Sequence, residues 1–176
     1  MRVLSVRLLA LGAAIAATGL SAQTTPAPTA PTDKVYSRLT TRWGRQVSPA
    51  NAWQSYPRPH LKRAAWKNLN GLWDYAIAPA NAPRPAGMDG QILVPFAVES
   101  QLSGVGRRVT PDDRLWYRRT FIVPAEWRDS HVMLNFGAVD FAATVWVNGA
   151  VVGSHQGGSD SFGFDIASFL LSLIHI

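Results

Sequence analysis

Short runs in which apolar and polar residues alternate recur along the second half of the chain. In the run 71–77, the alternation sets Trp73 and Tyr75 on one face of a strand and Asp74 on the other. Further strand-like runs are separated by Pro and Gly, and they cover residues 91–94, 115–123, 131–136, 143–147, 150–152 and 163–166. No stretch of helical length shows the period of an amphipathic helix. The pattern predicts an all-β fold of two packed sheets, a sandwich or a jelly roll.

The strongest turn signal is Asn148-Gly149, which lies between two of these apolar runs. Asn-Gly is typical of a type I′ hairpin turn, because both central residues of that turn need positive φ. Gly157-Gly158 follows shortly after the hairpin. Such a glycine pair lets the backbone approach a neighbouring surface closely.

Residues 1–22 have the pattern of a secretory signal peptide. Arg2 and Arg7 precede an uncharged run over residues 8–20, and Ala22 offers a cleavage site. The run is too short to span a bilayer comfortably, so a permanent anchor is the less favoured alternative. Residues 23–34 then read as a Pro/Thr-rich linker, and we expect the folded domain over residues 35–170. The prediction is a periplasmic or secreted protein without membrane association after cleavage.

The composition narrows the classes of partner and cofactor. The chain has 176 residues, 47% of them hydrophobic, and no Cys, so burial rather than disulfides must stabilise an exported domain. The formal net charge of +6 includes the two arginines of the signal peptide, and the remaining basic residues are scattered, which argues against a nucleic-acid partner. We expect no cofactor, because no His/Asp/Glu cluster has metal-ligand spacing and no Gly-rich loop has a phosphate-binding form.

Several segments over residues 56–169 carry a family resemblance. In chain order they read "WKNLNGLWDYAI", "ILVPFAVESQLSG", "LWYRRTFIVPAEW", "VMLNFGAVDFAATVWVNGAVVGSHQGG" and "FGFDIASF". Together they resemble the amino-terminal sugar-binding domain of glycoside hydrolase family 2, which includes β-galactosidases, β-glucuronidases and β-mannosidases. The run 159–161 departs from the family, in which Tyr and Pro are common after the glycine pair. The resemblance implies a jelly-roll β-sandwich, in agreement with the strand pattern.

The resemblance also implies where catalysis takes place. Family 2 enzymes are retaining O-glycosyl hydrolases, and their catalytic glutamates lie on a TIM barrel that follows an immunoglobulin-like domain; both domains are outside this chain. A retaining mechanism needs two carboxyl groups about 5 to 5.5 Å apart. The only glutamates here are Glu99 and Glu126, and the second is interpreted as a solvent-facing turn residue. We therefore expect no catalytic residue in this chain, which would bind a β-glycoside only within the full-length enzyme.

The candidate substrate-binding residues are Glu99 and Ser100. They follow "ILVPF", at a strand end where relatives bring polar side chains toward the terminal sugar. A carboxylate that accepts hydrogen bonds from two sugar hydroxyls suits this place, because charge-assisted hydrogen bonds are stronger than neutral ones. The alternative for the glutamate is an ion pair with Arg107, Arg108 or Arg118. The sequence of the segment "VPFAVESQLSG" is more similar to β-galactosidases than to the other enzymes of the family, so we expect a β-galactosidase.

Other conspicuous residues are interpreted as structural. His155 is expected to hydrogen-bond to the backbone rather than to contact sugar. Asp165 is expected to cap the turn that follows it. The side chains of Trp73, Trp116 and Trp146 are expected to pack in the interior instead of stacking on a sugar ring.

The end of the chain, residues 171–176, reads "LSLIHI". It resembles the translation of a transposon-end sequencing adapter, so we interpret it as a non-native tail, the alternative being a natural apolar tail. In either case we expect the jelly roll to be incomplete at its C-terminus, with an unpaired sheet edge that lowers solubility. A second function from another class stays open: a stand-alone carbohydrate-binding or adhesion sandwich.

Overall fold

The computed structural model describes residues 4–11, 40–58, 60, 62–127 and 129–170 of the chain. Strands dominate this part, and the helices within it are single 3₁₀ turns: η2 (Gly44–Gln46), η4 (Gln101–Ser103), η5 (Ala125–Trp127) and η6 (Ala167–Phe169). No helix in the described residues is long and apolar enough to cross a membrane. The predicted all-β class is therefore confirmed.

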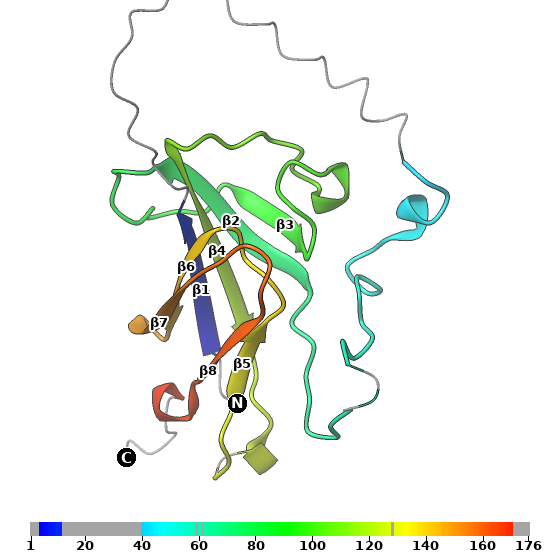
Figure 1. Ribbon diagram of the computed structural model, residues 1–176, viewed down its shortest axis with the longest axis vertical. Coiled ribbons are helices and arrows are strands. Elements are labelled where there is room, and N and C mark those ends of the chain that lie inside the picture. The colour runs from blue at the N-terminus through cyan, green and yellow to red at the C-terminus, as the bar shows by residue number, and fades with distance from the viewer. Residues whose placement is uncertain (1–3, 12–39, 59, 61, 128, 171–176) are drawn as a thin grey trace, which may run out of the picture.

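The strands form two sheets (Figure 1). The larger sheet has six antiparallel strands in the order β3 (Gly90–Val94), β2 (Gly71–Pro79), β4 (Asp113–Phe121), β1 (Leu4–Leu11), β6 (Ala142–Val147) and β7 (Ala150–Gln156). The smaller sheet pairs β5 (Met133–Phe136) with β8 (Phe162–Asp165). Each run that the alternation predicted as a strand contains or overlaps one of these strands.

The ends of the strands differ from the predicted ends where other contacts replace the ladder. The run 115–123 is paired only as far as Phe121. Beyond it, the carbonyl oxygen of Ile122 accepts a hydrogen bond from Lys67 Nζ at 2.9 Å. A side chain thus satisfies the backbone group that strand pairing would otherwise occupy.

The predicted type I′ turn is confirmed between β6 and β7. Asn148 and Gly149 have φ angles of 52° and 88°. The amide of Asn148 also donates from Nδ2 to the carbonyl oxygen of Phe169 at 2.7 Å. The hairpin is therefore fixed both by its own turn and by the segment that follows β8.

Replacing Gly149 with alanine is expected to lower the free energy of unfolding by about 1 to 2 kcal/mol. The reason is its φ of 88°, since a left-handed backbone brings an added Cβ against the following carbonyl oxygen. Urea denaturation followed by Trp fluorescence measures the change. The exposed neighbour Ala150, changed to serine, is the control and should shift the midpoint little.

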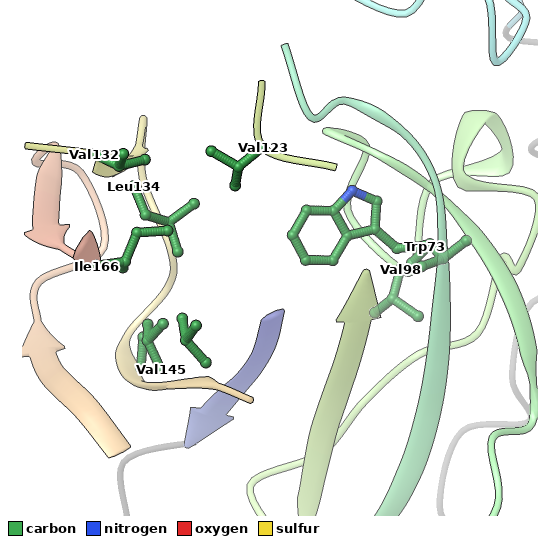
Figure 2. Packing of buried hydrophobic residues seen from close by; sticks show 10 residues of the cluster. Trp73, Val98, Val123, Val132, Leu134, Val145 and Ile166 are labelled. Atoms are coloured by element: carbon green, nitrogen blue, oxygen red, sulfur yellow. The ribbon is translucent and has the colours of Figure 1, made fainter. Parts of the chain in front are cut away.

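The interior lies between the two sheets. Val145 and Val147 of β6 and Ile92 of β3 are 0% exposed, and they belong to one cluster with residues of β5 and β8. Figure 2 shows Trp73 and Leu134 approaching this interior from opposite sides. The residues of β2 alternate as predicted, because Trp73 and Tyr75 join this cluster while Asp74 lies on the other face.

The two sheets are in contact where β7 meets β8. A Cβ added to Gly153 would lie 2.3 Å from Cε1 of Phe164. No side chain fits there without displacing the ring. Glycine at this position therefore lets the Phe164 ring pack directly on the backbone of β7.

The predicted domain limits are only partly covered by the described residues. Residues 4–11 of the predicted signal peptide form β1, a place in the sheet that the sequence pattern did not predict. The rest of that segment, the linker 23–34 and the tail 171–176 lie outside the described residues. The signal peptide, the linker and the tail stay predictions.

Candidate functional site

The loop between β3 and β4 carries both predicted substrate-binding residues. It begins at the cis Val94–Pro95 peptide and includes η4. The buried hydroxyl of Ser103 donates to the carbonyl oxygen of Ser100 at 2.6 Å and accepts from the backbone N–H of Val105 at 3.0 Å. These bonds give the loop a defined backbone on which exposed side chains can be positioned.

Ser100 has a structural role in this loop. Its Oγ accepts a hydrogen bond from the backbone N–H of Leu102 at 3.2 Å and so caps η4. The hydroxyl retains its own proton, which can still be donated to a ligand. Its proposed contact with sugar stays a prediction.

Glu99 is exposed on the same loop. Its carboxylate makes no hydrogen bond or ion pair with any other residue that the structure describes. The expected alternative partner Arg118 instead pairs with Asp74, with Nη2 2.8 Å from Oδ2. Glu99 is therefore available to accept hydrogen bonds from a ligand.

The negative charge of Glu99 affects the pKa of the buried Tyr117. Burial of its phenol, and secondly the negative charge of Glu99, raise the pKa of Tyr117 to about 12. Tyr117 stays neutral at physiological pH, so its hydroxyl keeps its proton. Glu99 thus lies near the strand β4 that runs through the middle of the sheet.

A second feature lies on the sheet face opposite the main interior. The rings of Trp116 and Trp146 stack there, with centroids 5.8 Å apart. A pocket of about 190 Å³ beside them is lined by Arg84, Pro85, Ala86, Met88, Trp116, Tyr117 and Arg118. Neither Glu99 nor Ser100 lines this pocket. Trp116 is buried, as expected, and it packs against Trp146 while it also lines this pocket.

The glycine pair after β7 accommodates two carboxylates of the same domain. A Cβ added to Gly157 would lie 2.3 Å from Asp160 Oδ1, and one added to Gly158 would lie 2.6 Å from Asp140 Oδ1. The backbone of the glycine pair was expected to approach a neighbouring surface. In the structure, the space beside it is taken by two side chains from loops of the same domain.

The hydrogen bond expected from His155 to the backbone is not present in the described residues, and the polar group beside the ring is a carboxylate. The His155 ring stacks on Phe162 with centroids 4.1 Å apart, and Nε2 lies 3.1 Å from Oδ2 of Asp160. The contact with Asp160 is an ion pair only when the ring is protonated, because Nε2 makes no hydrogen bond within the described residues. No group of three His, Cys, Asp or Glu side chains in the described residues is arranged to hold a metal ion.

Asp165 caps the turn that follows β8, as predicted. Its Oδ1 accepts from the backbone N–H of Ala167 at 2.9 Å, and its Oδ2 lies 2.5 Å from His131 Nδ1. These hydrogen bonds favour the ionised form, so the bond from Ala167 and secondly that from His131 lower the pKa of Asp165.

Acid is expected to weaken the domain through this carboxyl group. Because the folded pKa of Asp165 is below the unfolded one, its contribution is complete above about pH 4, the ordinary pKa of Asp, and is lost as the pH falls through the lowered value. Changing Asp165 to asparagine should flatten the fall in thermal midpoint between about pH 5 and pH 2. The exposed Asp112, changed to asparagine, is the control. An unchanged profile for the Asp165 variant would contradict this assignment.

Comparison with known protein families finds one match. The model of the family "Glycosyl hydrolases family 2, sugar binding domain" matches residues 104–173. This chain carries a family 2 sugar-binding domain. The matched range covers β4 to β8, which are three strands of the larger sheet and both strands of the smaller one.

The relatives of this family 2 domain are glycosidases. A β-glucuronidase of Paenibacillus borealis is 34% identical over 117 residues, covering 63% of this chain and 20% of that protein. A β-glucuronidase of Felis catus is 30% identical over 138 residues, covering 66% of this chain and 20% of that protein. A β-galactosidase of Thermoanaerobacter pseudethanolicus is 40% identical over 55 residues, covering 31% of this chain and 7% of that protein. The chain spans about a fifth of the length of the β-glucuronidases it matches.

The family 2 domain holds contacts that sequence reasoning missed. Asp160 lies in the run that departs from the family pattern, and the structure makes it the partner of His155. Asp140 faces the second glycine of the pair. The sequence signal that could have indicated the contact with His155 is the acidic Asp160 close to the glycine pair, where the family has other residues. Glu99 and Ser100 precede the matched range, so their role in binding stays a prediction.

Proposed function

We propose that this chain is the amino-terminal domain of an exported β-glycosidase. In that enzyme it contributes part of the substrate-binding surface, while bond cleavage takes place elsewhere in the longer protein. The observation that carries the proposal is the family 2 sugar-binding match at residues 104–173, in a chain that spans a fifth of its β-glucuronidase relatives. The pattern of residues 1–22 supports export to the periplasm or the exterior.

The proposal includes a jelly-roll fold for this domain and two further domains in the complete enzyme. A six-stranded and a two-stranded antiparallel sheet that share one interior support a jelly-roll sandwich. In the complete enzyme, the partners of this domain would be an immunoglobulin-like domain and a TIM barrel with the catalytic glutamates. The barrel would act as a retaining hydrolase on a β-glycoside.

The comparisons favour a β-glucuronide as the substrate of the complete enzyme. The similar β-glucuronidases align over 95 to 144 residues. The β-galactosidases align over 54 and 55 residues. The loop "VPFAVESQLSG" favoured a β-galactosidase, so the two indications differ, and the longer alignments carry more weight.

The test is the activity of the longer protein on chromogenic 4-nitrophenyl β-glucuronide and β-galactoside under the same conditions. We expect the longer protein to hydrolyse the β-glucuronide much faster than the β-galactoside. A preference for the galactoside would overturn the choice of substrate but keep the glycosidase. No turnover of any β-glycoside by a folded full-length protein would overturn the proposed function.

A further inference from the structure

The loop between β2 and β3 folds back over the face of the large sheet that lies opposite the main interior. At its start, the backbone N–H of Ala80 donates to the carbonyl oxygen of Asp112, just before β4, at 2.6 Å. At its end, Asp89 donates from its backbone N–H to the carbonyl oxygen of Tyr75 at 2.8 Å. The Oδ2 of Asp89 also accepts from the backbone N–H of Ile77 at 2.8 Å. Both ends of the loop are therefore fastened to the sheet.

The middle of this loop and the strand β4 enclose the pocket of about 190 Å³. The loop contributes Arg84 and Met88, and β4 contributes Trp116 and Arg118. Met88 packs against the small cluster that contains Trp116, so part of the wall is apolar. Every described lining residue falls within the predicted folded domain, residues 35–170, and not in the predicted signal peptide. Pockets for drug-sized ligands measure about 300 to 1,000 Å³, so this one suits a ligand built on a single ring.

The polar side chains of this pocket offer hydrogen-bond donors. The two guanidinium groups and the indole carry N–H groups and no strong acceptor. Trp116 is 7% exposed, and its Nε1 has no hydrogen-bond acceptor among the described residues. Tyr117 also lines the pocket, but its ring belongs to the main interior cluster. Because a buried donor without an acceptor is costly, the pocket is matched to a ligand that brings acceptors.

The charges at the pocket favour a ligand with one negative charge. Nε and Nη2 of Arg118 both donate to Oδ2 of Asp74, at 3.0 and 2.8 Å, which leaves Nη1 without a partner among the described residues. Arg84 is exposed and makes no hydrogen bond or ion pair within the part of the chain that the structure describes. Two guanidinium groups and one carboxylate leave a net charge of +1, which a single carboxylate neutralises. A phosphate monoester carries about −1.5 to −2 at neutral pH and would exceed it.

We infer that this pocket binds a small monocarboxylate with a ring body. The carboxylate of the ligand lies between the guanidinium groups of Arg84 and Arg118, because the flat guanidinium fork matches a carboxylate. The ring of the ligand lies against Met88, and the ligand supplies the acceptor that Nε1 of Trp116 lacks. Two kinds of molecule share this chemistry, a uronic acid and an aromatic acid. The inference does not depend on the proposed glycosidase.

Isothermal titration calorimetry of the full chain with D-glucuronate and with benzoate tests the inference and separates the two sources. At least one acid should bind in a saturable way, with a Kd of about 1 mM or lower. The neutral counterparts D-glucose and benzamide should bind at least about tenfold more weakly, since they lack the charge that the two arginines pair with. Binding of glucuronate alone would identify a sugar acid, binding of benzoate alone an aromatic acid, and binding of both would support the shared chemistry.

Three results of this titration would overturn the inference. The first is no binding of either acid up to about 10 mM. The second is equal binding of an acid and its neutral counterpart. The third is inorganic phosphate that binds as tightly as the acids, because the site would then take anions without regard to the carboxylate.

The variant Arg84→Gln places the binding in this pocket. It should weaken binding of the acid by at least about tenfold, since one charge-assisted contact is lost. Because Arg84 is exposed and has no partner in the described residues, the melting temperature without ligand should stay the same. The matched control is Arg58→Gln, since Arg58 is also exposed but does not line the pocket, and it should bind like the unmodified chain. Unchanged binding by the Arg84 variant, or an equal loss in both variants, would contradict the assignment.

Discussion

Replacing Trp73 with alanine is expected to lower the free energy of unfolding by about 4 kcal/mol. The indole is 6% exposed and belongs to the main interior cluster. Its Nε1 donates to the carbonyl oxygen of Leu69 at 2.8 Å, and its ring meets Tyr117 edge-on at 6.5 Å. The variant loses the buried area, leaves a cavity, and strands a carbonyl acceptor. Domains of this size are stable by only about 5 to 15 kcal/mol, so much of the stability is at risk.

Chemical denaturation of the full chain measures this effect, and Trp53 provides the matched control. Its indole is 73% exposed, so its replacement by alanine should change the unfolding free energy by less than about 0.5 kcal/mol. The conservative change of Trp73 to phenylalanine should fall between the two. Equal midpoints for the Trp73 and Trp53 alanine variants would show that the interior is not where the structure places it.

Changing Glu99 to glutamine is expected to raise the KM of the complete enzyme for its β-glycoside by about 10- to 100-fold. The estimate corresponds to about 1.5 to 3 kcal/mol for hydrogen bonds to a charged group. Because Glu99 is exposed and has no partner among the described residues, the substitution removes binding without disturbing the fold. The kcat should change much less, since a residue that binds the sugar equally in ground and transition states affects KM alone.

Steady-state kinetics of the full-length protein measures this split between KM and kcat. Glu126 in η5 is also an exposed glutamate, and its change to glutamine is the control that should leave both parameters unaltered. A Glu99 variant with unchanged KM would remove the residue from the binding site. A variant with lowered melting temperature would show instead that Glu99 supports the loop.

The strands could be predicted from sequence because each depends on local alternation. Trp73 and Tyr75 alternate with Asp74, and Asn148-Gly149 marks a turn whose positive φ angles few residue types adopt. The central position of β1 could not be predicted this way. Its apolar run is equally typical of a signal peptide, and its partners are far away in sequence, so no local periodicity relates them.

The candidate site was predicted in part for a similar reason. The exposure of Glu99 after a strand end follows from local sequence, and the structure confirms that its carboxylate is open to solvent. The capping bond of Ser100 also depends on near neighbours, yet its significance emerged only with η4 in place. The ion pair of Arg118 with Asp74 joins two strands, whereas sequence reasoning considered Arg118 only as one of three alternative partners of Glu99.

We propose that this domain shapes a sugar site while the bond-breaking carboxyl groups lie elsewhere in the protein. Hydrolysis of 4-nitrophenyl β-glucuronide and β-galactoside by the purified chain alone, after its cooperative unfolding has been verified, tests the claim most directly. We predict no turnover above the rate in buffer. Turnover by the chain alone, abolished by changing Glu99 or Glu126 to glutamine, would contradict it.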